Sequence, residues 1–192
     1  MNFPDMADFS QLALQCGSSV NPQTLRALAH IESSFNPFAI AVVNGRLDSQ
    51  PKSLAEAVAA VERLERGGKN YSVGYMQVNK HNFKKYGLTV QKAFDGCTNI
   101  RTGSKILEAC YVSASKTERN SQVALRKALS CYYSGNFIRG FQPENGKLSY
   151  VDKVVGRALG PEVSKGLPPT RTQKNGPLWA TPDFLATKRY QN

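Results

Sequence analysis

Glu32 is the residue of this sequence whose type and position best suit acid–base chemistry. It shares one face of a predicted helix with Leu25, Leu28 and Ala29, at the i, i+3, i+4 and i+7 positions of a core-facing stripe. Burial and the negative end of the helix dipole both disfavour its ionised form, so we expect a raised pKa. A carboxyl group that keeps its proton near neutral pH is suited to general acid catalysis. The alternative is that Glu32 bends out of the stripe to reach solvent or a lysine.

The helix that carries Glu32 has a clear signal at each end. Asn21–Pro22 predicts its start, because Asn accepts from the first free backbone N–H groups and Pro is tolerated at the first helical position. Asn36–Pro37 predicts its stop, since proline lacks an N–H and disfavours a helical residue before it. The carboxylate therefore falls near the carboxyl end of the helix.

Composition and charge limit the classes of function. The 192 residues suit one domain with a tail, and no apolar run approaches the ~18 residues of a membrane span. No basic residue precedes Arg26 and no apolar leader follows the first Met, so no signal peptide is visible; we expect a cytoplasmic protein or a shortened start. The net charge of +11 favours an anionic partner: nucleic acid, an acidic membrane face or a cell-wall polymer. The basic residues are scattered and form no nucleic-acid module, so no nucleic-acid partner is expected.

Four cysteines and two histidines show no metal-ligand spacing. The cysteines are Cys16, Cys97, Cys110 and Cys131, with no C-x-x-C pair among them. We therefore expect neither a metal site nor another cofactor. The even count permits two disulfides in any of three connectivities, and cysteines buried on helix faces are the alternative.

The remaining patterns predict a mainly α fold with one small β-hairpin. The hairpin is expected where the apolar run Ala39–Val43 enters Asn44–Gly45. Residues 71–79 suggest a turn that feeds a short helix ended by Gly87. Helices are predicted for residues 6–16, from the Ser53-x-x-Glu56 capping box to Gly67, for 99–114, for 120–132, and from Ser149-x-x-Asp152 to Gly160–Pro161. From Pro161 to the end, five prolines among polar and basic residues predict a flexible tail, residues 161–192, after a domain at 1–160.

Four further patterns occur in a fixed order along the chain. They are Glu32–Ser33 with Asn36–Pro37–x–Ala39, Gly74–Tyr–Met–Gln77, Cys131–Tyr–Tyr–Ser–Gly135, and Tyr150–Val151–x–x–Val154. Together they resemble the motifs of the lysozyme-like lytic transglycosylases, over roughly residues 6 to 160. The match looks closest to the branch that serves type IV secretion and conjugation systems, which implies a periplasmic location. Two positions depart from the family pattern: Tyr133 replaces an Asn and Ala41 replaces a small polar residue.

The resemblance implies a non-hydrolytic cleavage of peptidoglycan glycan strands. Glu32 would donate a proton to the leaving oxygen and then accept one from the 6-hydroxyl of N-acetylmuramic acid, which gives a 1,6-anhydro product. Tyr150 would hydrogen-bond Glu32. The residues implied to bind substrate are Ser33, Gly74, Met76, Gln77, Asn79, Tyr132 and Gly135.

Several of these residues also have a purely structural interpretation. Met76 and Tyr132 suit core packing, and Ser33 could bond back into its own helix. Gly74 and Gly135 suit a backbone conformation or a close approach that a side chain would block.

Two other functions remain open. A hydrolytic muramidase would need a second carboxylate, for which Asp48 is the candidate, although its Gln50–Pro51 neighbours suggest an ordinary exposed turn. A scaffold protein would use the tail to bind components of a secretion system.

Overall fold

The computed structural model describes residues 6–17, 19–143 and 146–159, and the contacts within it divide the chain into two units. Unit 1 contains the described residues up to Gly17 and Leu28–Gly103; unit 2 contains Ser19–Ala27 and the described residues from Ser104 onward. The predicted end of α8 at Gly160–Pro161 and the predicted tail at 161–192 lie outside the described residues, so both stay predictions.

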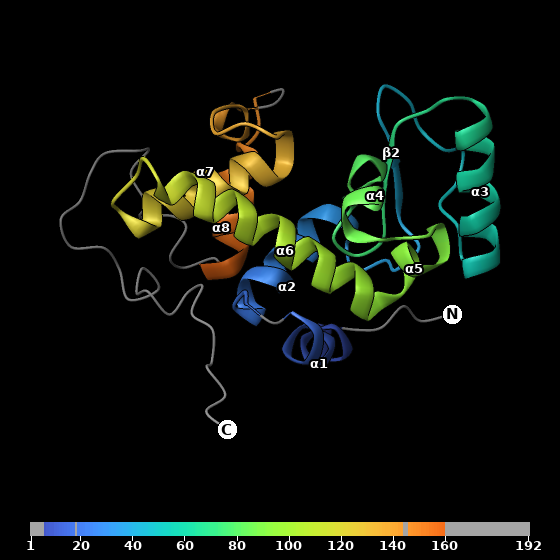
Figure 1. The fold of residues 1–192 in the computed structure, drawn as a ribbon, viewed down its shortest axis with the longest axis horizontal. Helices are drawn as coiled ribbons and strands as arrows, with labels where there is room; N and C mark the ends of the chain where they lie inside the picture. The colour runs from blue at the N-terminus through green and yellow to red at the C-terminus, as the bar shows by residue number, and fades with distance from the viewer. Residues whose placement is uncertain (1–5, 18, 144–145, 160–192) are drawn as a thin grey trace. The chain divides into compact units, whose positions relative to one another are not determined.

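Unit 1 combines short helices with one small sheet (Figure 1). Its elements are α1 (Met6–Cys16), the end of α2 (Pro22–Ser33), β1 (Ile40–Val42), α3 (Leu54–Arg66), β2 (Tyr71–Val73), β3 (Val78–Asn79), η1 (Lys80–Asn82), α4 (Phe83–Tyr86), α5 (Val90–Phe94) and the start of α6 (Gly96–Ser115). Its three strands lie in the order β1-β2-β3 and all pair antiparallel.

The hairpin predicted at Asn44–Gly45 is wrong, because β1 pairs with β2, a distant strand in the sequence. Ile40 lies opposite Val73 in this antiparallel pair. The expected turn does form, with Asn44 at φ +55° and the Gly45 N–H bonded to the Val42 carbonyl at 3.3 Å. No strand returns, since the Gln50 side chain accepts from the Ile40 N–H at 2.8 Å and donates to its carbonyl at 2.9 Å. One amide side chain thus occupies the edge of β1 that a returning strand would need.

Residues 71–79, where only a turn was expected, form the hairpin β2–β3. Ser72 pairs with Asn79, and Val73 pairs with Val78 across a turn at Gly74–Gln77. The short helix α4 follows, and Gly87 ends it as predicted, at φ +64°.

The core of unit 1 joins the sheet to α3 and α5. The buried side chains of this cluster are Ile40, Ala57, Ala60, Val61, Tyr71, Val73, Ala93 and Phe94. The predicted cap of α3 is present, since Ser53 Oγ accepts from the Glu56 N–H at 3.2 Å. A disulfide between Cys16 and Cys97 ties α1 to the start of α6.

The described residues of unit 2 form helices joined by loops, with no strand among them. Its elements are the start of α2, the end of α6, α7 (Ser121–Ser134), η2 (Arg139–Phe141) and α8 (Tyr150–Leu159). The predicted cap of α8 is confirmed, since Ser149 Oγ accepts from the Asp152 N–H at 3.2 Å. The helix predicted from residue 120 is α7, and Asn120 Oδ1 caps it by accepting from two of its N–H groups. A second disulfide joins Cys110 of α6 to Cys131 of α7.

The mainly α fold class is confirmed in the described residues, with a three-stranded sheet that contains the hairpin β2–β3. Across the described ranges, no helix has both the length and the apolar character that a bilayer crossing requires. The structure chooses one of the three disulfide connectivities that the sequence left open.

Candidate active site

The carboxyl end of α2 is a strained stretch of backbone directly after Glu32 and Ser33. Ser34 and Phe35 both take positive φ, at +50° and +62°, although neither is glycine. Such a conformation costs roughly 1–3 kcal/mol for each residue and persists only where the surroundings hold it. Phe35 is buried against the rings of Phe9 and His30, with centroids 5.2 and 5.6 Å away. The partly exposed Glu32 therefore sits on a helix end whose exit direction is fixed by packing.

Ser33 links this helix end to the Gly74–Gln77 turn. Its hydroxyl lies 2.9 Å from the Tyr75 carbonyl and 3.0 Å from the Ala29 carbonyl of its own helix. The single hydroxyl proton is thus directed to protein carbonyls, whereas the oxygen can still accept. The first two motifs of the sequence are brought together by this contact.

Asn99 holds the turn from inside unit 1, and the sequence analysis did not single it out. Its Oδ1 accepts from the Met76 N–H at 2.8 Å, and its Nδ2 donates to the carbonyls of Val73 at 3.0 Å and Ala93 at 2.7 Å. The side chain is 1% exposed, so these bonds satisfy it away from water. The missed signal was an amide on the buried stripe of α6, four residues before Gly103, analogous to the position of Glu32 on α2.

Gly74 is required by both conformation and contact. Its φ is +77°, and a Cβ built there would lie 2.4 Å from Asn99 Nδ2. A side chain would therefore displace the amide that fixes the turn.

Gln77 ends the turn with a positive φ and a buried side-chain oxygen. Its φ is +45°, and its Nε2 donates to the carbonyls of Ala39 at 3.1 Å and Gly74 at 2.9 Å. Its Oε1 is buried and has no hydrogen-bond partner among the described residues. A buried acceptor without a partner costs about 1–3 kcal/mol, and such groups together with backbone strain concentrate at functional sites.

Met76 and Asn79 are placed by structural contacts. Met76 is fully buried, and a Cβ on Gly103 would come within 2.6 Å of its Cβ, so this side chain supports the turn from the core. Asn79 Oδ1 caps η1 by accepting from the His81 N–H at 3.1 Å, and its Nδ2 donates to Ser72 Oγ at 3.2 Å.

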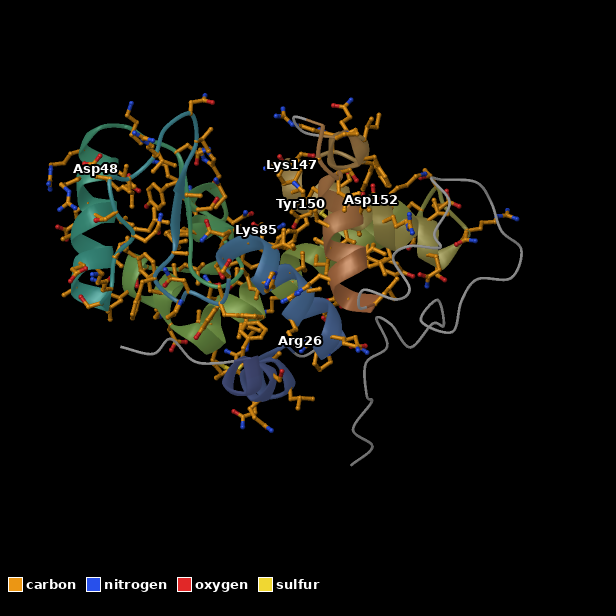
Figure 2. All side chains as sticks on the ribbon, turned by 180° about the vertical axis from the view of Figure 1, so that it is seen from behind. Arg26, Asp48, Lys85, Lys147, Tyr150 and Asp152 are labelled. Carbon is orange, nitrogen blue, oxygen red and sulfur yellow. A yellow bond between two sulfur atoms is a disulfide. The ribbon has the colours of Figure 1, made fainter. Side chains whose placement is uncertain are left out.

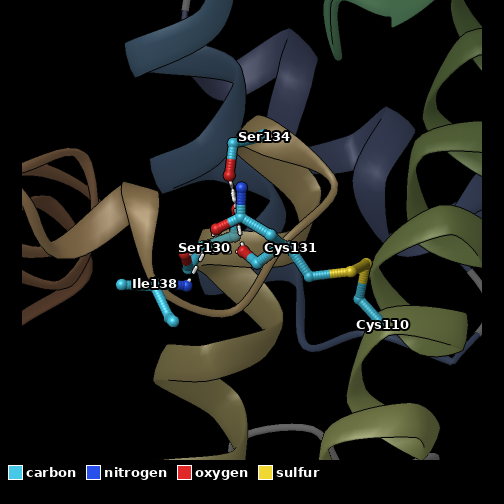
Figure 3. The surroundings of a disulfide bond; sticks show 6 residues. Cys110, Ser130, Cys131, Ser134 and Ile138 are labelled. Atoms are coloured by element: carbon cyan, nitrogen blue, oxygen red, sulfur yellow. Dashed lines mark hydrogen bonds between the residues drawn. A yellow bond between two sulfur atoms is a disulfide. The ribbon is translucent and has the colours of Figure 1, made fainter.

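In unit 2, the motif around Gly135 forms the end of α7 (Figure 3). Gly135 takes φ +74° and donates to the Cys131 carbonyl at 2.7 Å, while a Cβ there would meet nothing within 4 Å. Ser130 Oγ donates to the Asn136 carbonyl at 2.8 Å and accepts from the Gly140 N–H at 2.9 Å. With the Cys110–Cys131 disulfide beside it, this network fixes the loop that follows α7.

Tyr150 opens α8 and packs on Tyr133, the residue that departs from the family motif. The two rings stack with centroids 4.4 Å apart and planes 16° from parallel. Tyr150 is 6% exposed, whereas Tyr133 is 36% exposed. Figure 2 labels Tyr150 at the start of α8, together with Lys147 and Asp152 of the same unit. Tyr132 is a partly buried residue of α7.

Glu32 and Tyr150 belong to different units, and the hydrogen bond expected between them stays a prediction.

Asp48, the candidate second carboxylate, lies on the loop beside α3 (Figure 2). Asp95 Oδ1 accepts from the Thr98 N–H at 2.9 Å and so caps the start of α6. Hydrogen bonds from the Thr98 side chain and backbone lower the pKa of Asp95. In the part of the chain that the structure describes, no three metal-ligand side chains gather at one place.

Comparisons with known proteins match this chain to relatives of one kind. Type IV secretion system protein virB1 of Brucella suis biovar 1 (strain 1330) is 52% identical over 154 residues, which are 80% of this chain and 65% of that relative. Protein virB1 of Agrobacterium fabrum (strain C58 / ATCC 33970) is 34% identical over 161 residues, 83% of this chain and 64% of that relative. The chain thus spans just under two thirds of the length of these relatives. No solved structure matches it.

The family model described as "Transglycosylase SLT domain" matches residues 11–146, well over half of the chain. The match includes Glu32, the Gly74–Gln77 turn and the Gly135 end of α7, and it stops just before Tyr150. This chain belongs to the transglycosylase SLT domain family.

Proposed function

We propose that this chain is a peptidoglycan lytic transglycosylase with Glu32 as its catalytic acid and base. The observation that carries the proposal is the Ser33–Tyr75 hydrogen bond of 2.9 Å. It joins the residue next to Glu32 to the turn that holds Gln77, so a carboxylate and a buried unpaired acceptor lie on connected, strained backbone. The family match over residues 11–146 supports the same reaction class.

The chemistry requires one carboxyl group and no water. Glu32 donates its proton to the oxygen that leaves when the β-1,4 bond from N-acetylmuramic acid to N-acetylglucosamine breaks. The resulting carboxylate then accepts the proton of the 6-hydroxyl, whose oxygen bonds to the anomeric carbon. Glu32 ends in its starting state, and the product is a 1,6-anhydro sugar. Tyr150 would orient Glu32 through a hydrogen bond, and the turn that ends at Gln77 would line the glycan-binding site.

Three other carboxylates of unit 1 have structural roles. Glu56 Oε2 accepts from a backbone N–H before α3 at 2.8 Å, and Glu65 accepts from the Tyr71 hydroxyl at 2.6 Å. Asp95 caps α6. A hydrolase needs a second acid across the glycan, and the one candidate, Asp48, lies on the loop that faces α3.

The relatives support a proposal for the cellular setting of this activity. Their printed names include a type IV secretion system protein, and we infer that this chain opens the wall locally for such an apparatus in the periplasm. The net charge of +11 suits an anionic wall polymer, and a tail at residues 161–192 would bind secretion-system components.

The test replaces Glu32 by Gln and uses Glu62→Gln as the matched control, because Glu62 is an exposed residue of α3. We expect Glu32→Gln to release soluble muropeptides from purified peptidoglycan about 100- to 10,000-fold more slowly, the usual range for loss of a general acid. Glu62→Gln should match the parent, and circular dichroism should show both variants folded. A folded Glu32→Gln variant with parental activity would remove Glu32 from the reaction.

A further inference from the structure

A pocket of about 370 Å³ lies in unit 1 between the Arg46–Pro51 loop and one face of α3. The residues of α3 that line it are Glu56, Ala59, Ala60 and Arg63. Its volume is at the lower end of the ~300–1,000 Å³ common for small-ligand sites and suits about one or two amino-acid residues. The proposed cleavage reaction does not use this pocket.

The wall formed by the loop is held rigidly at both ends. At one end, the Gly45 N–H bonds to the Val42 carbonyl to close a turn. At the other, the Gln50 side chain makes two hydrogen bonds to the Ile40 backbone, and Pro51 is buried. A preformed wall lowers the entropic cost of binding a small ligand.

Four charged side chains line the pocket, two of each sign. Arg46 and Arg63 are cationic, and Asp48 and Glu56 are anionic. Within the described residues, the side chains of Arg46, Asp48 and Arg63 form no hydrogen bond or ion pair. The charges of Arg46, Asp48 and Arg63 are therefore not neutralised by ion pairs among these side chains.

We propose that this pocket binds a zwitterionic amino-acid group of a peptidoglycan stem peptide, with an ammonium and a carboxylate on the same carbon. Identifying the stem peptide as the source rests on the proposed function, whereas the pocket's preference for a zwitterion rests on its charges.

The chemistry of the lining favours this class of ligand over a simple anion. Arg63 and Arg46 present planar guanidinium groups that match a carboxylate, and Asp48 and Glu56 would accept from an ammonium. A phosphate dianion would be attracted by the two arginines but repelled by the two carboxylates. The apolar surface of Ala59 and Ala60 suits an aliphatic chain between the charged ends.

The test measures binding of one probe, the tripeptide L-alanyl-γ-D-glutamyl-meso-diaminopimelate, to the full chain by isothermal titration calorimetry at fixed salt. Arg63→Gln should weaken binding about tenfold or more, as expected for a lost charge-assisted hydrogen bond. Arg66→Gln is the matched control, because Arg66 is an exposed arginine in the next turn of α3 that does not line the pocket, and it should bind like the parent. Acetylating the diaminopimelate amine of the probe should also weaken binding.

Three outcomes would overturn the inference: no binding to the parent chain, equal losses in Arg63→Gln and Arg66→Gln, or displacement of the tripeptide by an equal concentration of inorganic phosphate. The probe contains no glycan, so its binding is independent of cleavage. Arg63→Gln should leave cleavage of peptide-free glycan strands unchanged. A chain that binds the tripeptide but cleaves no glycan would refute the proposed function alone, and the reverse result would refute the pocket alone.

Discussion

The Gly74–Gln77 turn in unit 1 and the Gly135 end of α7 in unit 2 both carry motif residues, and both place a glycine near φ +75°. They are held in different ways. The first is fixed by a buried amide, Asn99, that bonds three backbone groups. The second is fixed by the buried Ser130, by the exposed Asn136 and by the Cys110–Cys131 disulfide.

This difference indicates where each region tolerates change. When a buried amide such as Asn99 is removed, several buried backbone groups lose their hydrogen-bond partners. Each of these groups lowers the free energy of unfolding more than an exposed group that water can reach. The exposed Asn136 side chain costs less when it is removed, because water replaces its hydrogen bonds. The turn next to the Glu32 segment should therefore be the more sensitive of the two regions.

The largest expected effect comes from Asn99→Ala compared with Asn136→Ala. Each asparagine accepts from backbone N–H groups, Asn99 inside the core and Asn136 from Ile138 at 3.0 Å and Arg139 at 2.8 Å near the surface. We expect the free energy of unfolding to fall by about 4 kcal/mol for Asn99→Ala and about 1 kcal/mol for Asn136→Ala. Urea denaturation followed by circular dichroism measures both, and equal losses would contradict the proposed contrast.

Gly74→Ala and Gly135→Ala separate conformation from contact. Both variants force alanine to a positive φ, at roughly 1–2 kcal/mol, but only Gly74→Ala also meets Asn99, which adds about 1–3 kcal/mol. The double variant Gly74→Ala with Asn99→Ala should lose less stability than the sum of the single variants, since the clash is gone. Additive losses would show that Asn99 is not the obstacle.

Tyr133→Ala should affect turnover more than stability. Its ring stacks on Tyr150, and losing an aromatic pair costs about 0.5–1.5 kcal/mol. If Tyr133 positions Tyr150, kcat on peptidoglycan should fall at unchanged KM, whereas Tyr133→Phe should retain parental kcat. Parental kcat in the alanine variant would limit Tyr133 to packing.

The smallest expected effect concerns Glu65, whose pKa is lowered from 4.5 chiefly by the hydrogen bond from Tyr71, with Lys80 contributing. A carboxyl with a lowered folded pKa adds stability above its unfolded pKa and loses it as pH falls through the folded value. Because Glu65 is half exposed, Tyr71→Phe should cost below about 1 kcal/mol near neutral pH, and the difference should shrink below pH 4.5. Tyr86→Phe is the control. A difference that grows in acid would contradict this assignment.

Local signals predicted much of the fold. The caps Ser53 and Ser149 marked helix starts correctly because each acts on backbone within three residues. The helix end after Glu32 was also predicted, although the two positive φ values at Ser34 and Phe35 were not, since packing rather than residue type imposes them.

Contacts between distant residues could not be read from periodicity. The Gln50 side chain hydrogen-bonds the Ile40 backbone where a returning strand would have paired. The Asn44–Gly45 sequence therefore forms a turn without a hairpin. Asn99 bonds a turn that lies more than twenty residues earlier in the chain. The disulfide pairing depended in the same way on which helices meet.

The central claim is that Glu32 cleaves the glycan without water and without a second carboxylate. The most direct measurement digests peptidoglycan in heavy-oxygen water with the parent and with Asp48→Asn, then analyses the reducing ends by mass spectrometry. We predict unlabelled 1,6-anhydro ends from both proteins. Labelled reducing ends, together with loss of activity in Asp48→Asn, would contradict the claim and make this chain a hydrolytic muramidase.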